Sequence, residues 1–242
     1  MTDSTASLKS SWFLPRLFVA DGTVEGLKWL GLLLMTGDHV NKYLFNGTLA
    51  FLFEAGRLAM PIFVFVLAFN LARPDQLEKG VYQRTMKRLA VFGALASVPF
   101  IALGGLYAEW WPLNILFTLL ALTATAYLIE RGHTVWGALI FMNAGAMVEY
   151  WWPALLFGLA AWSYARKPTL SAVGVAVIAC AALGFVNGNM WALAVLPLMF
   201  VATFFDLRMP RLRWVFYAYY PLHLGALWLI RIPMSHAGYL FF

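Results

Sequence analysis

Charge is scarce in this sequence. Only 12% of its 242 residues are Asp, Glu, Lys or Arg, which is about half of the roughly 25% found in soluble domains. A surface that faces water on all sides cannot be built from so few charges, whereas 62% of the residues are hydrophobic and 17% are aromatic. The composition therefore excludes a soluble domain and indicates a polytopic membrane protein built from helices.

Cysteine and the common catalytic motifs are also nearly absent. A single cysteine, Cys180, excludes both an intrachain disulfide and a cysteine metal site. The sequence contains no HExxH motif, no glycine-rich phosphate loop before a lysine and no serine in a nucleophile elbow, so we expect no bound metal. The net charge of +6 is scattered over short loops and forms no stripe, so nucleic acid is not an expected partner.

Long apolar stretches fill most of the chain. Nine of them approach the about 20 residues that a helix needs to cross the hydrocarbon layer. They cover residues 27–45, 49–72, 88–104, 113–129, 135–149, 153–165, 170–185, 191–205 and 214–232. We expect an all-α bundle of about nine transmembrane helices, forming one domain over residues 27–242 among membrane lipids. The fifth and sixth stretches are short enough to belong to a broken or interfacial element.

The positions of Lys and Arg predict the orientation, because cytoplasmic loops carry an excess of both. If the N-terminus is cytoplasmic, only Lys42 and Arg231 fall on the opposite side, and Arg57 lies within a span. We therefore expect a multi-pass protein of the bacterial inner membrane with a periplasmic C-terminus. Residues 1–26 would form a cytoplasmic segment, either a loose tail or a helix on the inner surface. The residues suited to such a helix are Trp12, Phe13, Leu14, Arg16, Leu17 and Phe18.

Ionisable residues within the spans are few, and each is costly at membrane depth. The first span carries Asp38 and His39, and the second carries Glu54 and Arg57. Neighbouring residues on a helix diverge by about 100°, so Asp38 cannot orient His39. We expect Asp38 to bond across to Arg57, or to Lys42 one turn later, which leaves His39 facing a cavity. Glu54 is as readily a structural partner as a functional one.

Two later spans add polar groups to this set. Asn114 and Thr118 lie four residues apart on one stripe of the fourth span, and Tyr220 lies within one turn of His223 in the last. His223 is consistent with either a cavity residue or a hydrogen-bonded core histidine. The cluster around His39 is the more costly and favours function. We interpret Glu109 and Glu149, each next to a tryptophan pair, as interfacial residues.

At these residues the sequence resembles the TraX family of membrane proteins, which is associated with conjugation and pilin N-acetylation and is similar to a wider superfamily of transmembrane acyltransferases. The resemblance covers most of the chain. It is carried by residues 27–30 and 35–40, by residues 56–65, by Tyr82 with Arg88 and Leu89, by residues 113–119 and by residues 220–224.

The resemblance implies an acyltransferase that moves an acetyl group from cytoplasmic acetyl-CoA to an acceptor, foremost the N-terminal amine of a pilin subunit. His39 would be the catalytic base, with Asp38 and Arg57 in the same catalytic group. The acceptor cavity would be lined by Asn114, Thr118, Tyr220 and His223. The nucleotide would be bound at the inner mouth of a through-membrane tunnel by Arg84, Lys87, Arg88, Arg208, Arg211 and Arg213.

Other functions stay open at this point. The same site suits O-acetylation of a lipid-linked or surface glycan, or a different amide-forming reaction at a pilin terminus. A transporter would use the intramembrane charges as a relay, although the sequence has no paired repeats of the kind typical of carriers. A pilus assembly factor without catalysis is the remaining alternative. The oligomeric state is not specified by any of these patterns.

Overall fold

The fold is known from a computed structural model, which describes residues 14–104 and 106–241. Within these ranges the chain is helical and forms no strand, only an isolated bridge between Leu113 and Val148. The all-helical class predicted from the sequence is thus confirmed. The elements are α1 (Asp21–Leu44), α2 (Ala50–Gly56), α3 (Ala59–Leu71), α4 (Val81–Leu103), α5 (Ile115–Glu130), α6 (Thr134–Gly145), α7 (Trp151–Arg166), α8 (Leu170–Asn187), the 3-10 helix η1 (Trp191–Ala194), α9 (Val195–Ala202) and α10 (Arg213–His236).

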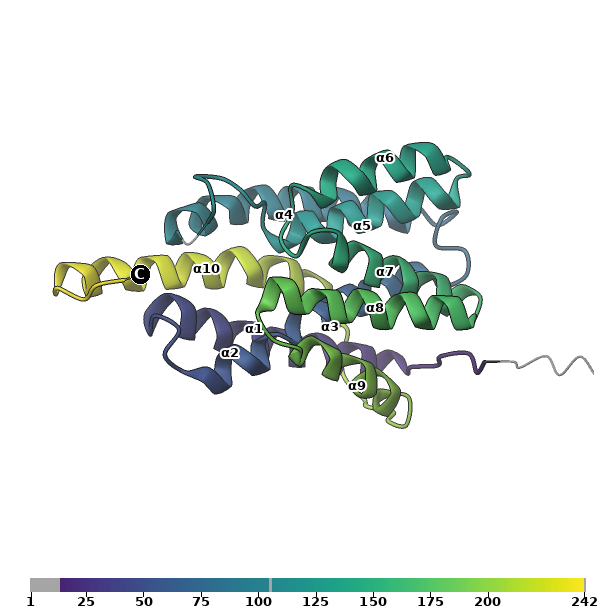
Figure 1. The fold of residues 1–242 in the computed structure, drawn as a ribbon, viewed down its shortest axis with the longest axis horizontal. Coiled ribbons are helices and arrows are strands. Elements are labelled where there is room, and N and C mark those ends of the chain that lie inside the picture. The colour runs from purple at the N-terminus through teal and green to yellow at the C-terminus, as the bar shows by residue number, and fades with distance from the viewer. Residues whose placement is uncertain (1–13, 105, 242) are drawn as a thin grey trace, which may run out of the picture.

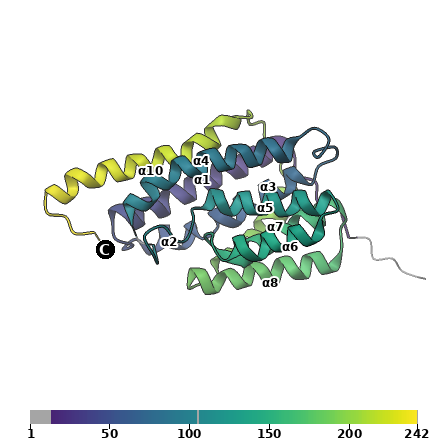
Figure 2. The same ribbon diagram turned by 90° about the horizontal axis from the view of Figure 1, so that it is seen from above.

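The helices lie side by side along the long axis of the molecule (Figure 1). Helix α10 packs on α4, α5 packs on α4 and α6, and α7 packs on α8 and α3. Helix α1 contacts α2, α3 and α10, so it lies between the N-terminal and C-terminal parts of the bundle (Figure 2). This position brings residues of α1 next to residues nearly 200 positions later in the chain.

The outer surface carries many large apolar side chains. Among the described residues, three helical segments are long and apolar enough to cross a membrane, namely Ala50–Leu71, Val81–Leu103 and Leu170–Asn187. Large apolar side chains are nevertheless directed outward, with Phe185 91% exposed and Phe51 77% exposed. Soluble proteins rarely show extended apolar patches of this kind, so the surface indicates contact with lipid acyl chains.

Several helix boundaries differ from those expected. Helix α1 begins six residues earlier than predicted, at Asp21, and residues 14–20 form no helix. Of the two forms expected for the N-terminal segment, a loose tail or an interfacial helix, residues 14–20 do not form the helix, and Trp12 and Phe13 lie outside the described residues. The second stretch is divided into α2 and α3, with Arg57 in the break between them. Pro61 falls in the first turn of α3, where a missing backbone N–H is best tolerated.

Candidate functional site

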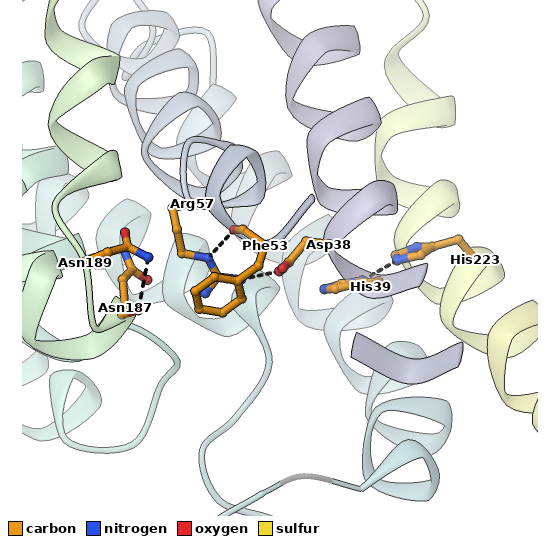
Figure 3. Close-up of polar contacts among 7 residues, drawn as sticks. All are labelled: Asp38, His39, Phe53, Arg57, Asn187, Asn189 and His223. Carbon is orange, nitrogen blue, oxygen red and sulfur yellow. Dashed lines mark hydrogen bonds and ion pairs between the residues drawn. The ribbon is translucent and has the colours of Figure 1, made fainter. Parts of the chain in front are cut away.

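Asp38 of α1 and Arg57 form an ion pair between helices. The Nη2 atom of Arg57 donates to Asp38 Oδ2, and its Nε donates to the carbonyl oxygen of Phe53 at 3.1 Å (Figure 3). A Cβ on Gly56 would lie 2.4 Å from the Cβ of Asp38, so glycine at this position lets α2 approach α1 closely enough for the pair to form. This is the cross-helix bond expected for Asp38, and it fixes the guanidinium beside the next residue of α1.

That next residue, His39, is bonded to His223 of α10. Its Nδ1 lies 2.7 Å from His223 Nε2, and the two rings are nearly parallel, with 9° between their planes (Figure 3). His223 Nδ1 lies 3.0 Å from the carbonyl oxygen of Tyr219, which can only accept. A neutral His223 therefore carries its proton on Nδ1 and accepts through Nε2. His39 must then donate from Nδ1, which leaves its Nε2 lone pair as a base.

Tyrosine side chains hold this histidine pair in place. The ring of Tyr219 stacks on His223 at 5.2 Å, and its hydroxyl lies 2.7 Å from Thr36 Oγ1 on α1. Tyr220 is 3% exposed and meets the His223 ring edge-on at 5.4 Å. The bonds between α1 and α10 thus fix both the distance between the imidazoles and their orientation.

Two cavities are lined by this cluster, and a third adjoins them. The outer cavity, about 370 Å³, is lined by 16 residues, among them Asp38, His39, Arg57, Glu149 and Asn187. The small cavity, about 30 Å³, shares Asp38, His39 and Glu149 with the outer one. The inner cavity, about 570 Å³, has Phe63 in common with the small one. His39 therefore lines both the outer and the small cavity, and Phe63 stands between the small cavity and the inner one.

The inner cavity is strongly basic. Its lining includes Lys28, Lys79, Arg84, Arg88 and Arg211, and no Asp or Glu is found among the described residues of its wall. The Arg88 guanidinium lies 4.9 Å from the ring of Trp214, and Lys28 is paired with Glu25 at 2.7 Å. A cavity with this lining suits a ligand that carries several phosphates.

The six basic residues expected at the inner mouth do not all line the inner cavity. Arg84, Arg88 and Arg211 line the inner cavity. Lys87 and Arg208 are exposed and are not part of its wall. The side chain of Arg213 lies outside the part of the structure that is described. Lys28 and Lys79, which the sequence did not single out for this task, supply further positive charge.

Three of the four predicted acceptor-cavity residues lie behind the wall of the outer and small cavities. Asn114 is fully buried, with its amide donating to Gly93 O and its Oδ1 capping α5 at the N–H of Leu116. Thr118 is also fully buried and donates to the carbonyl oxygen of Glu149. His223 stands behind His39. Tyr220 alone of the four lines a cavity, the small one. Asn114 and Thr118 thus shape the site by fixing the elements around it.

Glu149 is the functional candidate that the sequence reasoning missed. It was interpreted as interfacial, yet it lies in the loop between α6 and α7 and lines both the outer and the small cavity. Its carboxyl group shares the outer cavity with Asp38, Lys42 and Arg57. The available signal was the shortness of the fifth and sixth stretches, because a break between two short helices lies at membrane depth only when protein surrounds it.

The backbone after Glu149 is strained. Tyr150 and Trp151 have φ angles of 63° and 50°, a left-handed conformation that bulky residues rarely adopt. The loop is held in this shape by bonds from Leu113 N to Met147 O and from Glu149 N to Leu113 O, at 2.8 and 2.9 Å. Strain of this kind gathers at ligand sites, and both residues line the outer cavity.

The described geometry supports neither an ion-pair role for Glu54 nor a metal site. Among the described ion pairs, Arg57 bonds Asp38 and Glu54 takes no part. Within the described ranges, no group of three or more His, Cys, Asp or Glu side chains is placed to hold a metal ion. The polar groups brought together at the site are the imidazole pair, the ion pair and the carboxyl group of Glu149 on the cavity wall.

Comparison with known proteins identifies the family of this chain. A profile of the family described as TraX protein matches residues 23–231. The protein named Protein TraX from Escherichia coli is 31% identical over 115 residues, which cover 48% of this chain and 43% of that protein. The match thus spans less than half the length of that relative. No solved structure matches the chain. The profile match extends over most of the sequence and includes α1 through most of α10, and the chain therefore belongs to the TraX family.

Proposed function

We propose that this chain is an inner-membrane acetyltransferase that moves the acetyl group of cytoplasmic acetyl-CoA to the N-terminal amine of a conjugative pilin subunit. It would cross the membrane nine times, with the N-terminus inside and the C-terminus outside. The observation that carries the proposal is the position of His39. It lines the outer cavity and the small cavity, which adjoins the basic cavity at Phe63, and its Nδ1 bond to His223 leaves Nε2 available as a base.

The basic cavity suits the donor. The phosphates of CoA would bind Lys28, Arg84, Arg88 and Arg211, all of which line it. These residues fall on the side where the Lys and Arg excess predicts cytoplasm. Lys28 and His39 are eleven residues apart on α1, about 16 Å at 1.5 Å per residue. The extended pantetheine arm would cross this distance and bring the thioester past Phe63 to His39.

The outer cavity would present the acceptor amine to that thioester. The amine nitrogen attacks the acetyl carbonyl carbon, and His39 Nε2 takes the proton that the nitrogen loses. The C–N bond forms, the C–S bond breaks, and the electron pair of the latter leaves with the CoA sulfur. Arg57 lies beside His39 with five guanidinium N–H donors, only two of which its bonds to Asp38 and Phe53 engage. The others would stabilise negative charge on the carbonyl oxygen.

His223 would support this step without touching either substrate. As His39 becomes an imidazolium, its Nδ1–H bond to His223 changes from a neutral to a charge-assisted bond, which is about twice as strong. The stabilisation therefore grows toward the transition state. Interactions that are stronger in the transition state than in the ground state accelerate the reaction.

The test uses the purified full chain in lipid nanodiscs with acetyl-CoA labelled in the acetyl group and a short peptide with a free N-terminus. We expect label on the peptide amine, loss of that product in His39→Ala, and weaker acetyl-CoA binding in an Arg84→Ala/Arg88→Ala variant. Arg131→Ala, which removes an exposed arginine from the loop between α5 and α6, is the matched control.

Each alternative has a distinct result in the same assay. Label on a glycan and none on the peptide would show that the acceptor is a glycan and not a pilin subunit. Binding of acetyl-CoA without transfer, unchanged in His39→Ala, would refute the enzyme. Absence of acetyl-CoA binding would refute acetyl-CoA as the donor, and the remaining alternatives would be a transporter or an assembly factor.

A further inference from the structure

The outer cavity is lined by a buried carboxamide that forms no hydrogen bond with any described residue. Asn187, the last residue of α8, is 5% exposed and lines this cavity. Within the described part of the chain, neither its Nδ2 nor its Oδ1 has a hydrogen-bond partner. Buried side-chain polar groups are nearly always bonded, so an amide that is unpaired at both ends requires an explanation.

The position of Asn187 is fixed by its surroundings. Gly188 ends α8 in the left-handed conformation, φ 70°, and donates to the carbonyl oxygen of Gly184 at 2.9 Å. Asn189 bonds the backbone carbonyl of Asn187 at 3.5 Å and accepts from Trp191 N at 3.1 Å (Figure 3). The main chain is thus held on both sides while the side chain is left without a bond, as in a preorganised binding group.

A second amide on the same cavity wall, that of Asn41, has a described hydrogen-bond partner for its oxygen but none for its nitrogen. Asn41 of α1 is 1% exposed and accepts from Leu49 N through Oδ1 at 2.8 Å. Its Nδ2 is buried and, among the described residues, has no partner. Together the two side chains offer one acceptor and two amide groups as donors, on the cavity that also holds His39.

We propose that Asn187 binds a peptide group of the acceptor chain, with Oδ1 accepting from the peptide N–H and Nδ2 donating to its carbonyl. This rests on the proposed function, because the acceptor is the peptide whose amine reaches His39. Asn41 Nδ2 donates to a further carbonyl of the same chain. Figure 3 shows Asn187 on the side of Arg57 away from His39, so the bound peptide runs from the histidine past the guanidinium to the end of α8.

The rest of the lining favours a peptide over a glycan. A sugar presents hydroxyl groups on several sides, each of which needs a partner when buried. Large parts of this wall are apolar, including Phe53, Leu106, Pro112 and Val186. An extended peptide has its donors and acceptors along the backbone, where two amides can meet them, and small side chains that suit an apolar wall. A carboxamide also matches a peptide group in the spacing of donor and acceptor.

The test measures binding, so it needs no acetyl transfer. The full chain in nanodiscs is titrated with trialanine amide and with two analogues, each of which has an ester oxygen in place of one peptide N–H. We expect one analogue to bind wild-type protein about tenfold more weakly than the amide, and Asn187→Ala to lose that difference, as in a double-mutant cycle. Asn143→Ala, at an exposed asparagine of α6, should keep the wild-type preference.

A stability measurement distinguishes a ligand-binding role of Asn187 from a structural role. Because its amide makes no bond within the described protein, replacing Asn187 by Ala or Leu should leave the unfolding temperature unchanged or raise it, as is common for groups kept for function. A structural asparagine would lower it.

Equal peptide binding by wild type and Asn187→Ala would overturn the proposal. So would an ester penalty that persists in the variant, a lowered unfolding temperature without loss of binding, or tighter Asn187-dependent binding of chitobiose than of the peptide. If the chain binds trialanine amide through Asn187 yet transfers no acetyl group, the proposed reaction fails and the peptide subsite stands.

Discussion

The bond between His39 and His223 makes a quantitative prediction about rate. His223 is not among the residues that line the outer, small or inner cavity, and in the proposed reaction it acts only through His39 Nδ1. A neutral hydrogen bond contributes about 0.5–1.5 kcal/mol net and one to a charged group about 1.5–3 kcal/mol. The bond therefore strengthens by about 1–2 kcal/mol as His39 takes its proton, which corresponds to roughly 5- to 30-fold in rate.

Two substitutions test this step. His223→Phe keeps a ring between the tyrosines but removes the acceptor, so kcat should fall roughly 5- to 30-fold, while KM for acetyl-CoA and for the acceptor stays unchanged. His223→Gln retains an oxygen acceptor near the same position and should recover part of the loss. His39→Ala removes the base itself, and general-base catalysis is worth about 10²–10⁴-fold, so it should lose much more.

The assay is steady-state transfer of labelled acetyl to peptide by the purified chain, with the unfolding temperature of each variant measured in parallel. Full activity in His223→Phe would refute the tautomer argument. Equal losses in His223→Phe and His223→Gln would show that packing, and not the acceptor atom, is what α10 supplies.

Three further perturbations follow from the same geometry. Arg57→Ala leaves the Asp38 carboxylate buried without its partner and should destabilise the protein by about 3–5 kcal/mol, with part of this recovered in Asp38→Asn/Arg57→Ala, as measured by thermal unfolding in nanodiscs. Glu149→Gln removes one of the two carboxyl groups, with Asp38, that line both the outer and the small cavity and should raise the unfolding temperature at neutral pH, because neighbouring like charges repel; a lowered unfolding temperature would contradict this reasoning. Phe63→Ala opens the wall shared by the small and inner cavities and should raise acceptor-independent hydrolysis of acetyl-CoA severalfold, measured as free thiol release; unchanged hydrolysis would show that Phe63 does not limit access of water.

The sequence predicted those parts of the molecule that depend on local composition. Scarce charge and long apolar stretches predicted a helical membrane protein, and the helical class is confirmed. The divergence of neighbouring side chains on a helix predicted that Asp38 bonds Arg57 or Lys42 while His39 faces a cavity, and in the structure Asp38 bonds Arg57 and His39 lines the outer and small cavities. Both inferences use only the geometry of one helix and the cost of a buried charge, so no knowledge of the packing was needed.

What the sequence did not predict depends on loops and on contacts distant in the chain. Glu149 resembled an interfacial acid because it stands beside a tryptophan pair, and only the bonds of its loop to Leu113 place it on the cavity wall. Asn114 resembled a cavity residue, but the approach of α4 to α5 supplies Gly93 O as the partner of its amide. Asn187 was not predicted as a site residue, because asparagine is common at helix ends and the lack of a side-chain partner depends on how the helices pack.

Four residues that break local rules line one cavity. Asn187 is a buried amide without a bond in the described protein, Glu149 is a half-buried carboxyl group on the same wall as Asp38, and Tyr150 and Trp151 adopt a left-handed backbone without glycine. Each of these features lowers stability, and all four residues line the outer cavity beside His39. A sequence can usually remove such costs by single substitutions, and natural proteins keep them mainly where function requires it. These four residues support the outer cavity as the proposed site independently of the family resemblance and of the imidazole pair, and substitutions at these four positions are expected to stabilise the chain.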